Sequence, residues 1–427
     1  MAESFTIEDL HAIEILDSRG RPTVQTTCRL QGRVLATVQV PSGASTGLAE
    51  AHELRDGDPA RYGGLGCREA VANVNGTILT TVLGRRLDGI SDLDRLLIDL
   101  DGTDNLARLG ANAVLSVSLA AARAMAQQSG EPLYLWFARA FGLPAPSRLP
   151  RPTVNLFSGG KHAGGQIPIQ DVLITAIGTD DPAEAMEQIV AVFNAAADLF
   201  RVKYGMRILV ADEGGLAPDF ASVESALDDA VAAIERARLR PGEDIALCVD
   251  VAASHFFAEG AYEISGQRLT SAEMIERIDG WLGRYPIQSV EDGLAEDDWS
   301  MWPELRSRIG GETLVLGDDF LATNPERIGR AVASGAANAL LLKVNQIGTL
   351  TQAAEALRLA REAGWAVVVS ARSGETEDTW LTDLAVGWGG DQLKVGSVTR
   401  SERLAKWNRL LTIADETGWG LAPWPGH

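Results

Sequence analysis

The sequence predicts an α/β protein with a (β/α)8 barrel over residues 143–427 and an N-terminal α+β capping domain over residues 1–142. Three observations support this fold class. Short apolar runs recur through the second half of the chain, each followed by a charged residue, a loop and a helical pattern. The charged residues lie roughly 22 to 41 positions apart, which is enough for one strand and one helix per unit. Four prolines within residues 143–152 exclude a helix there and predict a stiff connection between two domains.

The N-terminal domain begins with strand patterns and continues with helical ones. Residues 13–16 and 23–39 contain alternating and β-branched segments, and a turn sequence, Ser-Arg-Gly-Arg-Pro, lies between them at 18–22. This combination is typical of an antiparallel meander. Residues 111–127 carry leucines and many alanines, which predicts a closely packed apolar helix.

Two segments of small residues are predicted to form loops. Residues 41–47 read Pro-Ser-Gly-Ala-Ser-Thr-Gly, and the backbone of such a loop can move and can approach an anion closely. Residues 158–165 read Ser-Gly-Gly-Lys-His-Ala-Gly-Gly, with His162 in the middle. A single loop of this kind is more often a plain linker, and a lone loop histidine is more often solvated. Two such loops facing a charged barrel mouth favour a lid.

Charged residues end the predicted barrel strands. Lys343 is the clearest case, because residues 339–342 have the pattern of a strand buried on both faces, which does not ordinarily tolerate an ammonium group. The residues at such ends are Glu213, Asp250, Glu291, Asp318, Lys343, Arg372 and Lys394. Because the carboxyl ends of parallel barrel strands meet on one face, we expect these side chains to converge on one pocket. A structural ion-pair network at the barrel mouth is the alternative interpretation.

The composition of the 427 residues is that of a globular protein, with 46% hydrophobic residues. A net charge of −20 argues against nucleic acid or an anionic membrane as a partner. No apolar run reaches membrane-spanning length and no signal segment is recognisable, so we expect a cytoplasmic protein. The cysteines at 28, 67 and 248 are odd in number and unclustered, which indicates neither a disulfide framework nor a cysteine-type zinc site.

Lysine is rare in this chain. Of its 38 basic residues only five are lysines, at 161, 203, 343, 394 and 406. Two of these five end predicted strands. An amine can lose its proton where a guanidinium cannot, so these two positions are candidates for proton transfer. Chance survival under a codon bias toward arginine is the alternative.

Six motifs resemble those of the enolase family. They are Pro-Ser-Gly-Ala-Ser-Thr-Gly at 41–47, Lys-His-Ala-Gly-Gly at 161–165, Asp-Glu-Gly-Gly-Leu-Ala-Pro at 212–218, Val-Glu-Asp-Gly-Leu-Ala-Glu-Asp-Asp-Trp at 290–299, Leu-Leu-Lys-Val-Asn-Gln-Ile-Gly-Thr-Leu at 341–350 and Arg-Ser-Gly-Glu-Thr-Glu-Asp-Thr at 372–379. The similarity covers nearly the whole chain. It implies an enolase-type barrel with an N-terminal capping domain, and a hydro-lyase that removes water from 2-phosphoglycerate to give phosphoenolpyruvate.

The resemblance implies two Mg²⁺ ions per active site. Asp250, Glu291 and Asp318 match the magnesium ligands of the family, and Ser45 matches a loop residue that binds the second ion. Three hard oxygen ligands suit Mg²⁺. Family resemblance also implies a homodimer or higher homo-oligomer built mainly through the N-terminal domain.

The resemblance also assigns catalytic and substrate-binding residues. Lys343 matches the base, and we expect Lys394 and the metals beside it to lower its pKa; Glu213 matches the acid that assists departure of the hydroxyl. Arg372 and Ser373 match the phosphoryl-binding pair. The remaining candidates are Asp171 and His162 for catalysis and Gln170, Lys161, Ala371, Ser42, Gly43 and Ala44 for substrate binding.

Two positions depart from the family pattern. The family has Gln-Glu where this chain has Gln170-Asp171, and Ser-His-Arg-Ser where residues 370–373 read Ser-Ala-Arg-Ser. The aspartate should pull its carboxylate back by more than about an ångström, where catalysis needs sub-ångström placement. Ala371 should leave a void beside Arg372.

These two changes favour a divergent paralogue that acts on a 2-phosphoglycerate analogue enlarged at phosphorus. Carboxyphosphonoenolpyruvate synthase, of phosphonate and phosphinate antibiotic biosynthesis, is an enzyme of this kind. On this hypothesis the partner is a phosphorylated or phosphonylated glycerate, and Lys161 is a candidate for binding an additional negative charge. Ordinary glycolytic enolase activity is the alternative, and a catalytically inactive binding protein is a third interpretation.

Overall fold

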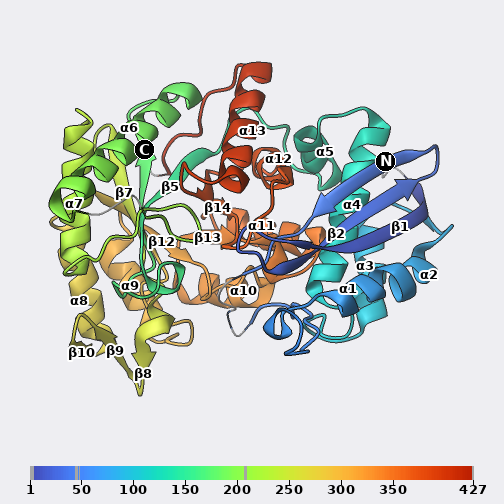
Figure 1. The fold of residues 1–427 in the computed structure, drawn as a ribbon, viewed down its shortest axis with the longest axis horizontal. Coiled ribbons are helices and arrows are strands. Elements are labelled where there is room, and N and C mark those ends of the chain that lie inside the picture. Colours follow the sequence, from blue (N-terminus) through green and yellow to red (C-terminus); the bar gives the residue numbers. More distant parts are fainter. Residues whose placement is uncertain (1–3, 44–46, 48, 206–208, 426–427) are drawn as a thin grey trace.

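The computed structural model describes residues 4–43, 47, 49–205 and 209–425. It contains an N-terminal antiparallel sheet with its helices and, next to them, a closed eight-stranded barrel (Figure 1). The predicted fold class is confirmed. The predicted boundary between residues 142 and 143 stays a prediction.

The N-terminal sheet has the strand order β3-β2-β1-β4, and its paired strands run antiparallel. Its strands are β1 (Phe5–Leu16), β2 (Pro22–Leu30), β3 (Val34–Gln39) and β4 (Arg86–Leu87). The helices beside it are α1 (Arg68–Asn73), α2 (Leu79–Val82), α3 (Ile90–Asp101), α4 (Ala111–Ser129) and α5 (Leu133–Ala140). Val24, Thr26 and Cys28 alternate along the buried face of β2, and Thr26 shares a 2.7 Å hydrogen bond with Ser116 of α4. The small alanines of α4 allow this close packing of helix on sheet.

Eight strands close the barrel in the order β5-β6-β7-β11-β12-β13-β14-β15. They are β5 (Arg151–Ser158), β6 (Asp171–Ala176), β7 (Ile245–Asp250), β11 (Ile287–Glu291), β12 (Leu314–Gly317), β13 (Ala339–Leu342), β14 (Ala366–Ser370) and β15 (Gln392–Gly396). Leu341 packs in the barrel interior, whereas Leu340 and Leu342 belong to the apolar layer under the helices. This alternation is why strands of a covered barrel are apolar on both faces.

The helices that surround the barrel are α6 (Pro182–Lys203), α7 (Val223–Arg236), α8 (Ser271–Leu282), α9 (Trp302–Ile309), α10 (Pro325–Ser334), α11 (Leu350–Glu362), α12 (Trp380–Gly387) and α13 (Ser401–Thr417). A small three-stranded sheet of β8 (Phe257–Ala258), β9 (Ala261–Ile264) and β10 (Gln267–Leu269) precedes α8. In the part of the chain that the structure describes, every helix is too short or too polar to cross a membrane.

Two details of the predicted barrel are wrong. The barrel is mixed and not fully parallel, because β6 runs antiparallel to both β5 and β7. The loop of residues 159–170 between β5 and β6 contains only the short 3-10 turn Gly160–His162 and no crossover helix, which is typical of an antiparallel connection. Glu213 was expected at the end of a strand, but residues 209–213 lie in a loop that contributes only an isolated bridge at Val210.

A buried carboxylate joins the two domains. Asp94 of α3 accepts hydrogen bonds from the backbone N–H of Thr351 at 2.8 Å and from its hydroxyl at 2.6 Å. The first N–H groups of α11 have no partner within the helix, so Asp94 satisfies one of them. Burial outweighs these hydrogen bonds and raises the pKa of Asp94 to about 6.

This raised pKa predicts a pH-dependent stability. The folded protein holds a proton on Asp94 more tightly than the unfolded chain, so its free energy of unfolding should fall as the pH rises from 3.8 to about 6 and should not recover above that window. Asp94→Asn keeps an acceptor oxygen and cannot ionise. In this variant the decrease in the free energy of unfolding across the pH window, on the order of 1–3 kcal/mol, should disappear. Urea unfolding between pH 4 and pH 7 measures it, with exposed Asp99→Asn on the same helix as control. A profile unchanged by Asp94→Asn would contradict the prediction.

Candidate active site

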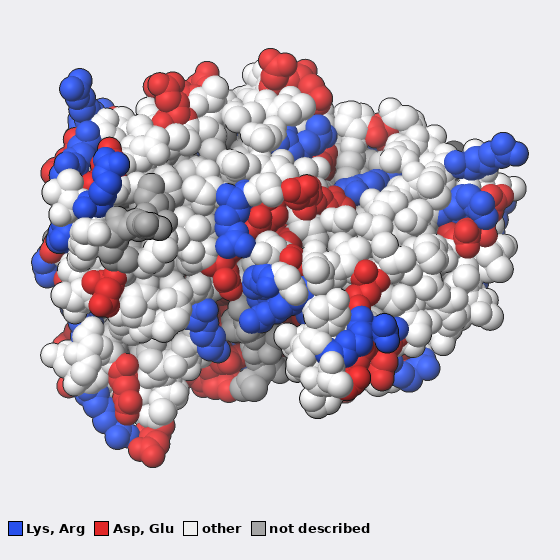
Figure 2. Space-filling model, in the orientation of Figure 1, with Lys and Arg blue, Asp and Glu red and all other residues white. Residues whose placement is uncertain are grey.

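Charged side chains gather where the carboxyl ends of the barrel strands face the N-terminal domain. Figure 2 shows basic and acidic side chains side by side near the middle of this view, where the two domains meet. The small cavity at this position is lined by His162, Gln170, Glu213, Asp250, Lys343, Ser370, Ala371, Arg372, Ser373 and Lys394. The predicted convergence of strand-end residues is therefore present in the structure.

Lys394 lies within β15 and crosses the barrel mouth to two carboxylates. Its Nζ donates to Asp250 Oδ2 at 3.0 Å and to both Glu291 oxygens at 2.7 Å. These two partners stand at the last residues of β7 and β11. Burial alone would lower the pKa of Lys394, but Asp250 and Glu291 raise it well above its ordinary value. These two carboxylates therefore favour the charged form of Lys394.

Lys343 follows β13 and contacts a third carboxylate. Its Nζ lies 2.5 Å from Asp318 Oδ2, and both side chains are mostly buried. Burial, Arg372 and Lys394 lower the pKa of Lys343, in the direction expected from the sequence, but carboxylates that include Asp318 and Glu291 act in the opposite direction and the net pKa is raised. Whatever draws Asp318 away from this lysine would free the amine to lose its proton.

The three carboxylates that pair with these lysines offer hard oxygen atoms to a cation, although the group whose ligand atoms lie within 4.8 Å of one another, in the part of the chain that the structure describes, is a different one, His162, Asp171 and Glu213. Asp250, Glu291 and Asp318 are buried oxygen donors within one mouth, and burial together with Asp250 raises the pKa of Glu291 well above its ordinary range. Gln170 donates to Asp250 at 3.3 Å, and its Oε1 is buried with no hydrogen-bond partner among the described residues. An excess of hard oxygen donors with an orphaned amide oxygen beside them is the donor set that Mg²⁺ prefers.

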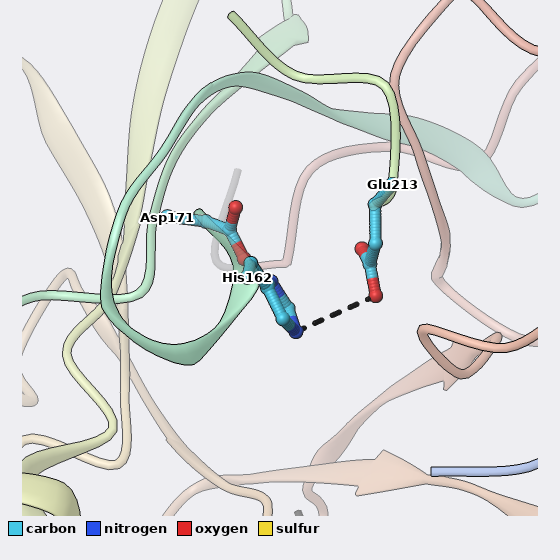
Figure 3. A group of neighbouring side chains, drawn as sticks. All are labelled: His162, Asp171 and Glu213. Atoms are coloured by element: carbon cyan, nitrogen blue, oxygen red, sulfur yellow. Dashed lines mark hydrogen bonds and ion pairs between the residues drawn. The ribbon is translucent and has the colours of Figure 1, made fainter. Parts of the chain in front are cut away.

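A second cluster joins His162, Asp171 and Glu213 (Figure 3). His162 Nδ1 lies 2.8 Å from Asp171 Oδ2, and its Nε2 lies 3.6 Å from Glu213 Oε1. Ser158 and Asn155 of β5 donate to Asp171 and Glu213, which fixes both carboxylates. Burial opposes the charged imidazole, but Asp171 and Glu213 raise the pKa of His162 to about 9. The three ligand atoms lie close enough together to hold a metal ion, and without one they form a proton-holding network.

Arg372 and Ser373 stand on the loop after β14. Arg372 Nη1 donates to Glu50 Oε2 at 3.1 Å and to Asn345 Oδ1 at 2.9 Å. Fully buried Arg403 of α13 donates to the carbonyl oxygens of Arg372 and Ser373, which holds the loop in place. Such a braced arginine and hydroxyl can bind an anionic oxygen group.

Ala371 lines the small cavity at the barrel mouth. It is buried, and the cavity that it shares with Arg372 has a volume of about 20 Å³, which is enough for about one water molecule. The space beside Arg372 is therefore small, and the prediction that Ala371 makes room for a larger substrate stays a prediction.

The other predicted site residues lie at the edge or outside the described residues. Lys161 is exposed beside the cluster, and Ser42 and Gly43 line a neighbouring cavity of about 440 Å³ with Glu50. Ala44 and Ser45 are outside the described residues. Sequence analysis missed Glu50, which binds Arg372, although its position directly after the small-residue loop was a usable signal.

Comparison with known proteins gives two family matches and a close relative. Residues 7–137 match the family described as Enolase, N-terminal domain, and residues 146–425 match Enolase, C-terminal TIM barrel domain. The protein named Enolase 1 of Methylococcus capsulatus (strain Bath) is 47% identical over 415 residues, which cover 96% of this chain and 97% of the relative. With the mixed barrel, its capping domain and the charged mouth between them, these matches show that the chain belongs to the enolase family, whose members are hydro-lyases.

Proposed function

We propose that this protein removes water from 2-phosphoglycerate to give phosphoenolpyruvate. The observation that carries the proposal is the meeting of Lys343, Lys394 and Arg372 with buried carboxylates at one barrel mouth. Similarity to Enolase 1 over almost the whole chain supports the same reaction. The proposal favours ordinary enolase activity over the enlarged substrate that the sequence suggested.

The residues divide the chemistry among them. Lys343 takes the proton from the carbon next to the substrate carboxylate, and Lys394 stays charged to face the negative charge that develops there. Asp250, Glu291 and Asp318 would hold Mg²⁺, with Ser45 assigned to a second ion by resemblance; when bound, these ions add positive charge beside the substrate carboxylate. Sites of the enolase superfamily use a lysine or histidine base with one or two Mg²⁺ ions. Arg372 and Ser373 bind the phosphoryl group.

The proton for the departing hydroxyl lies on the cluster of His162, Asp171 and Glu213. Burial would raise the pKa of Glu213, but the nearby cations, His162 first and then Arg403 and the two lysines, together lower it and favour the ionised carboxylate. The imidazolium beside it is the proton store, so the pair supplies the proton as a unit. Asp171 holds the imidazole by its Nδ1 and leaves Nε2 facing Glu213.

We also propose that the protein is a cytoplasmic homodimer assembled mainly through its N-terminal domain. The support for this assembly is the membership of the enolase family.

Turnover of 2-phosphoglycerate with Mg²⁺, followed by the absorbance of the enol double bond, tests the reaction. Lys343→Ala should lower the rate by about 10³-fold, because it removes the base. Lys203→Ala is the matched control, since that lysine pairs with Asp229 on the outer surface and should change the rate less than about twofold. Mg²⁺ binding without turnover in the unmodified protein would contradict the proposed substrate, and no Mg²⁺ binding would favour a catalytically inactive protein.

The raised pKa of His162 predicts a titration that NMR of the imidazole can follow. The ring should stay protonated at neutral pH and lose its charge near pH 9. Asp171→Asn removes the largest favourable interaction and should move the midpoint to lower pH, with a matching loss of activity on the alkaline side. Exposed Asp219→Asn should leave the midpoint in place. An unmoved midpoint in Asp171→Asn would contradict the assignment.

A second candidate is an analogue of 2-phosphoglycerate that carries an additional negative group on phosphorus. The observation that favours it is a cation at the edge of the mouth. Burial and the charge of Lys161 lower the pKa of half-buried His255 to about 4, and the Nδ1 of His255 has no hydrogen-bond partner among the described residues. The exposed ammonium of Lys161 is the group to which an extra carboxylate can bind, whereas the Nδ1 of His255 is buried.

This second candidate predicts a selective effect of Lys161. Lys161→Ala should weaken binding of a carboxylated analogue by about 5- to 10-fold and leave 2-phosphoglycerate almost unaffected, whereas Lys161→Arg should keep both. Calorimetric titration of both ligands measures it. Equal effects of Lys161→Ala on the two ligands would remove the second candidate.

A further inference from the structure

An arginine of the N-terminal domain reaches the predicted phosphoryl-binding loop. Arg19 lies in the turn between β1 and β2, which Asp17 stabilises by accepting the backbone N–H groups of Arg19 at 2.8 Å and Arg21 at 3.0 Å. The other carboxylate oxygen of Asp17 pairs with the Arg19 guanidinium at 2.9 Å. The side chains of this pair are 4% and 0% exposed, so Arg19 is held in one position.

The remaining guanidinium hydrogens connect two segments of the site. Nη1 donates to Ser373 Oγ at 3.0 Å, and Nη2 donates to the carbonyl oxygen of Ser42 at 3.0 Å. Ser42 begins the small-residue loop of residues 42–47, and Ser373 follows Arg372. Arg19 therefore joins the start of this loop to the phosphoryl-binding hydroxyl.

Gly374 makes this connection possible. A Cβ at this position would lie 2.2 Å from both Arg19 Nη2 and Asp17 Oδ2. Its backbone also exchanges two hydrogen bonds with Ser42, of 2.8 and 2.9 Å. Because Gly374 has no side chain, the Arg19 guanidinium has room at the place where the backbones of Ser42 and Gly374 pair.

We infer that Arg19 is a positioning residue that orients the hydroxyl of Ser373 for phosphoryl binding. A hydroxyl oxygen that accepts from Nη1 cannot aim its own hydrogen back at that donor, so the O–H bond is left to donate toward the cavity that Ser373 lines. Arg19 itself is buried and its hydrogen bonds are directed to protein groups, so it acts through Ser373. This inference rests on the proposed function, because it takes the ligand of Ser373 to be a phosphoryl group.

Calorimetric binding of inorganic phosphate to the whole protein with Mg²⁺ tests the inference. Arg19→Lys keeps a charge for Asp17 but cannot also reach Ser373 and Ser42, and should weaken phosphate binding about 10-fold. In a Ser373→Ala background the same change should have almost no further effect. Gly374→Ala, which displaces the guanidinium without removing it, should reproduce the loss, and keeps the test open if Arg19→Lys does not fold. Arg29→Lys is the matched control, because Arg29 lies on the exposed face of the same sheet.

Kinetics separate this role from a general loss of structure. Arg19→Lys should raise the KM for 2-phosphoglycerate and change kcat less, and thermal unfolding should show a folded variant. Phosphate binding unchanged in Arg19→Lys, or weakened equally with and without Ser373, would overturn the inference, as would absence of phosphate binding in the unmodified protein. Phosphate binding that depends on Arg19, in a protein that does not turn over 2-phosphoglycerate, would overturn the proposed reaction alone.

Discussion

The contact of Lys394 with Asp250 and Glu291 is the interaction on which the site depends. It connects β15 to β7 and β11 across the mouth of the barrel. A buried ammonium or carboxylate without a partner would cost several kcal/mol, so none of the three can be altered alone without leaving the others uncompensated. The same contact favours the charged form of Lys394, as the contact with Asp318 does for Lys343. Both lysines of the mouth are therefore held by buried carboxylates.

The two domains complete this site together. The barrel supplies the lysines, the buried carboxylates that pair with them and Arg372, whereas the N-terminal domain supplies Glu50 and Arg19. Glu50 accepts a hydrogen bond from Arg372 and also accepts one from the backbone N–H of Gly47 at 3.0 Å. It therefore connects the last residue of the small-residue loop to the arginine that would bind an anion. An anion that competes for Arg372 would therefore also change the contacts of this loop. Anion binding at Arg372 and the contact of Glu50 with Gly47 are therefore linked through one carboxylate.

The sequence predicted the barrel because its physical cause is local. A strand covered on both faces must be apolar throughout, and a charge at its end stands out, as Lys343 after β13 does. Other features depend on contacts between distant segments and leave no local pattern. The reversed direction of β6 follows from a short connection within a stretch of glycines, and Glu213 reaches the site from a loop that resembles a strand in composition. Glu50 and Arg19 were missed because each is one charged residue among many, and only the fold places them beside Arg372 and Ser373.

The two departures from the family pattern have different consequences in the structure. Asp171 lies among the residues of the site, as the sequence predicted. Ser158 and His162 bind its two oxygens and hold the shorter side chain at the start of β6. Ala371 removes a titratable ring and lines a cavity of about 20 Å³, which is room for about one water molecule. So small a cavity gives little support to the argument for an enlarged substrate. What remains for a larger ligand is the charge of Lys161 at the rim, and a charge at the rim affects which anions bind more than which bonds break. The chemistry of the mouth therefore favours 2-phosphoglycerate, and any departure in substrate is to be sought at the rim.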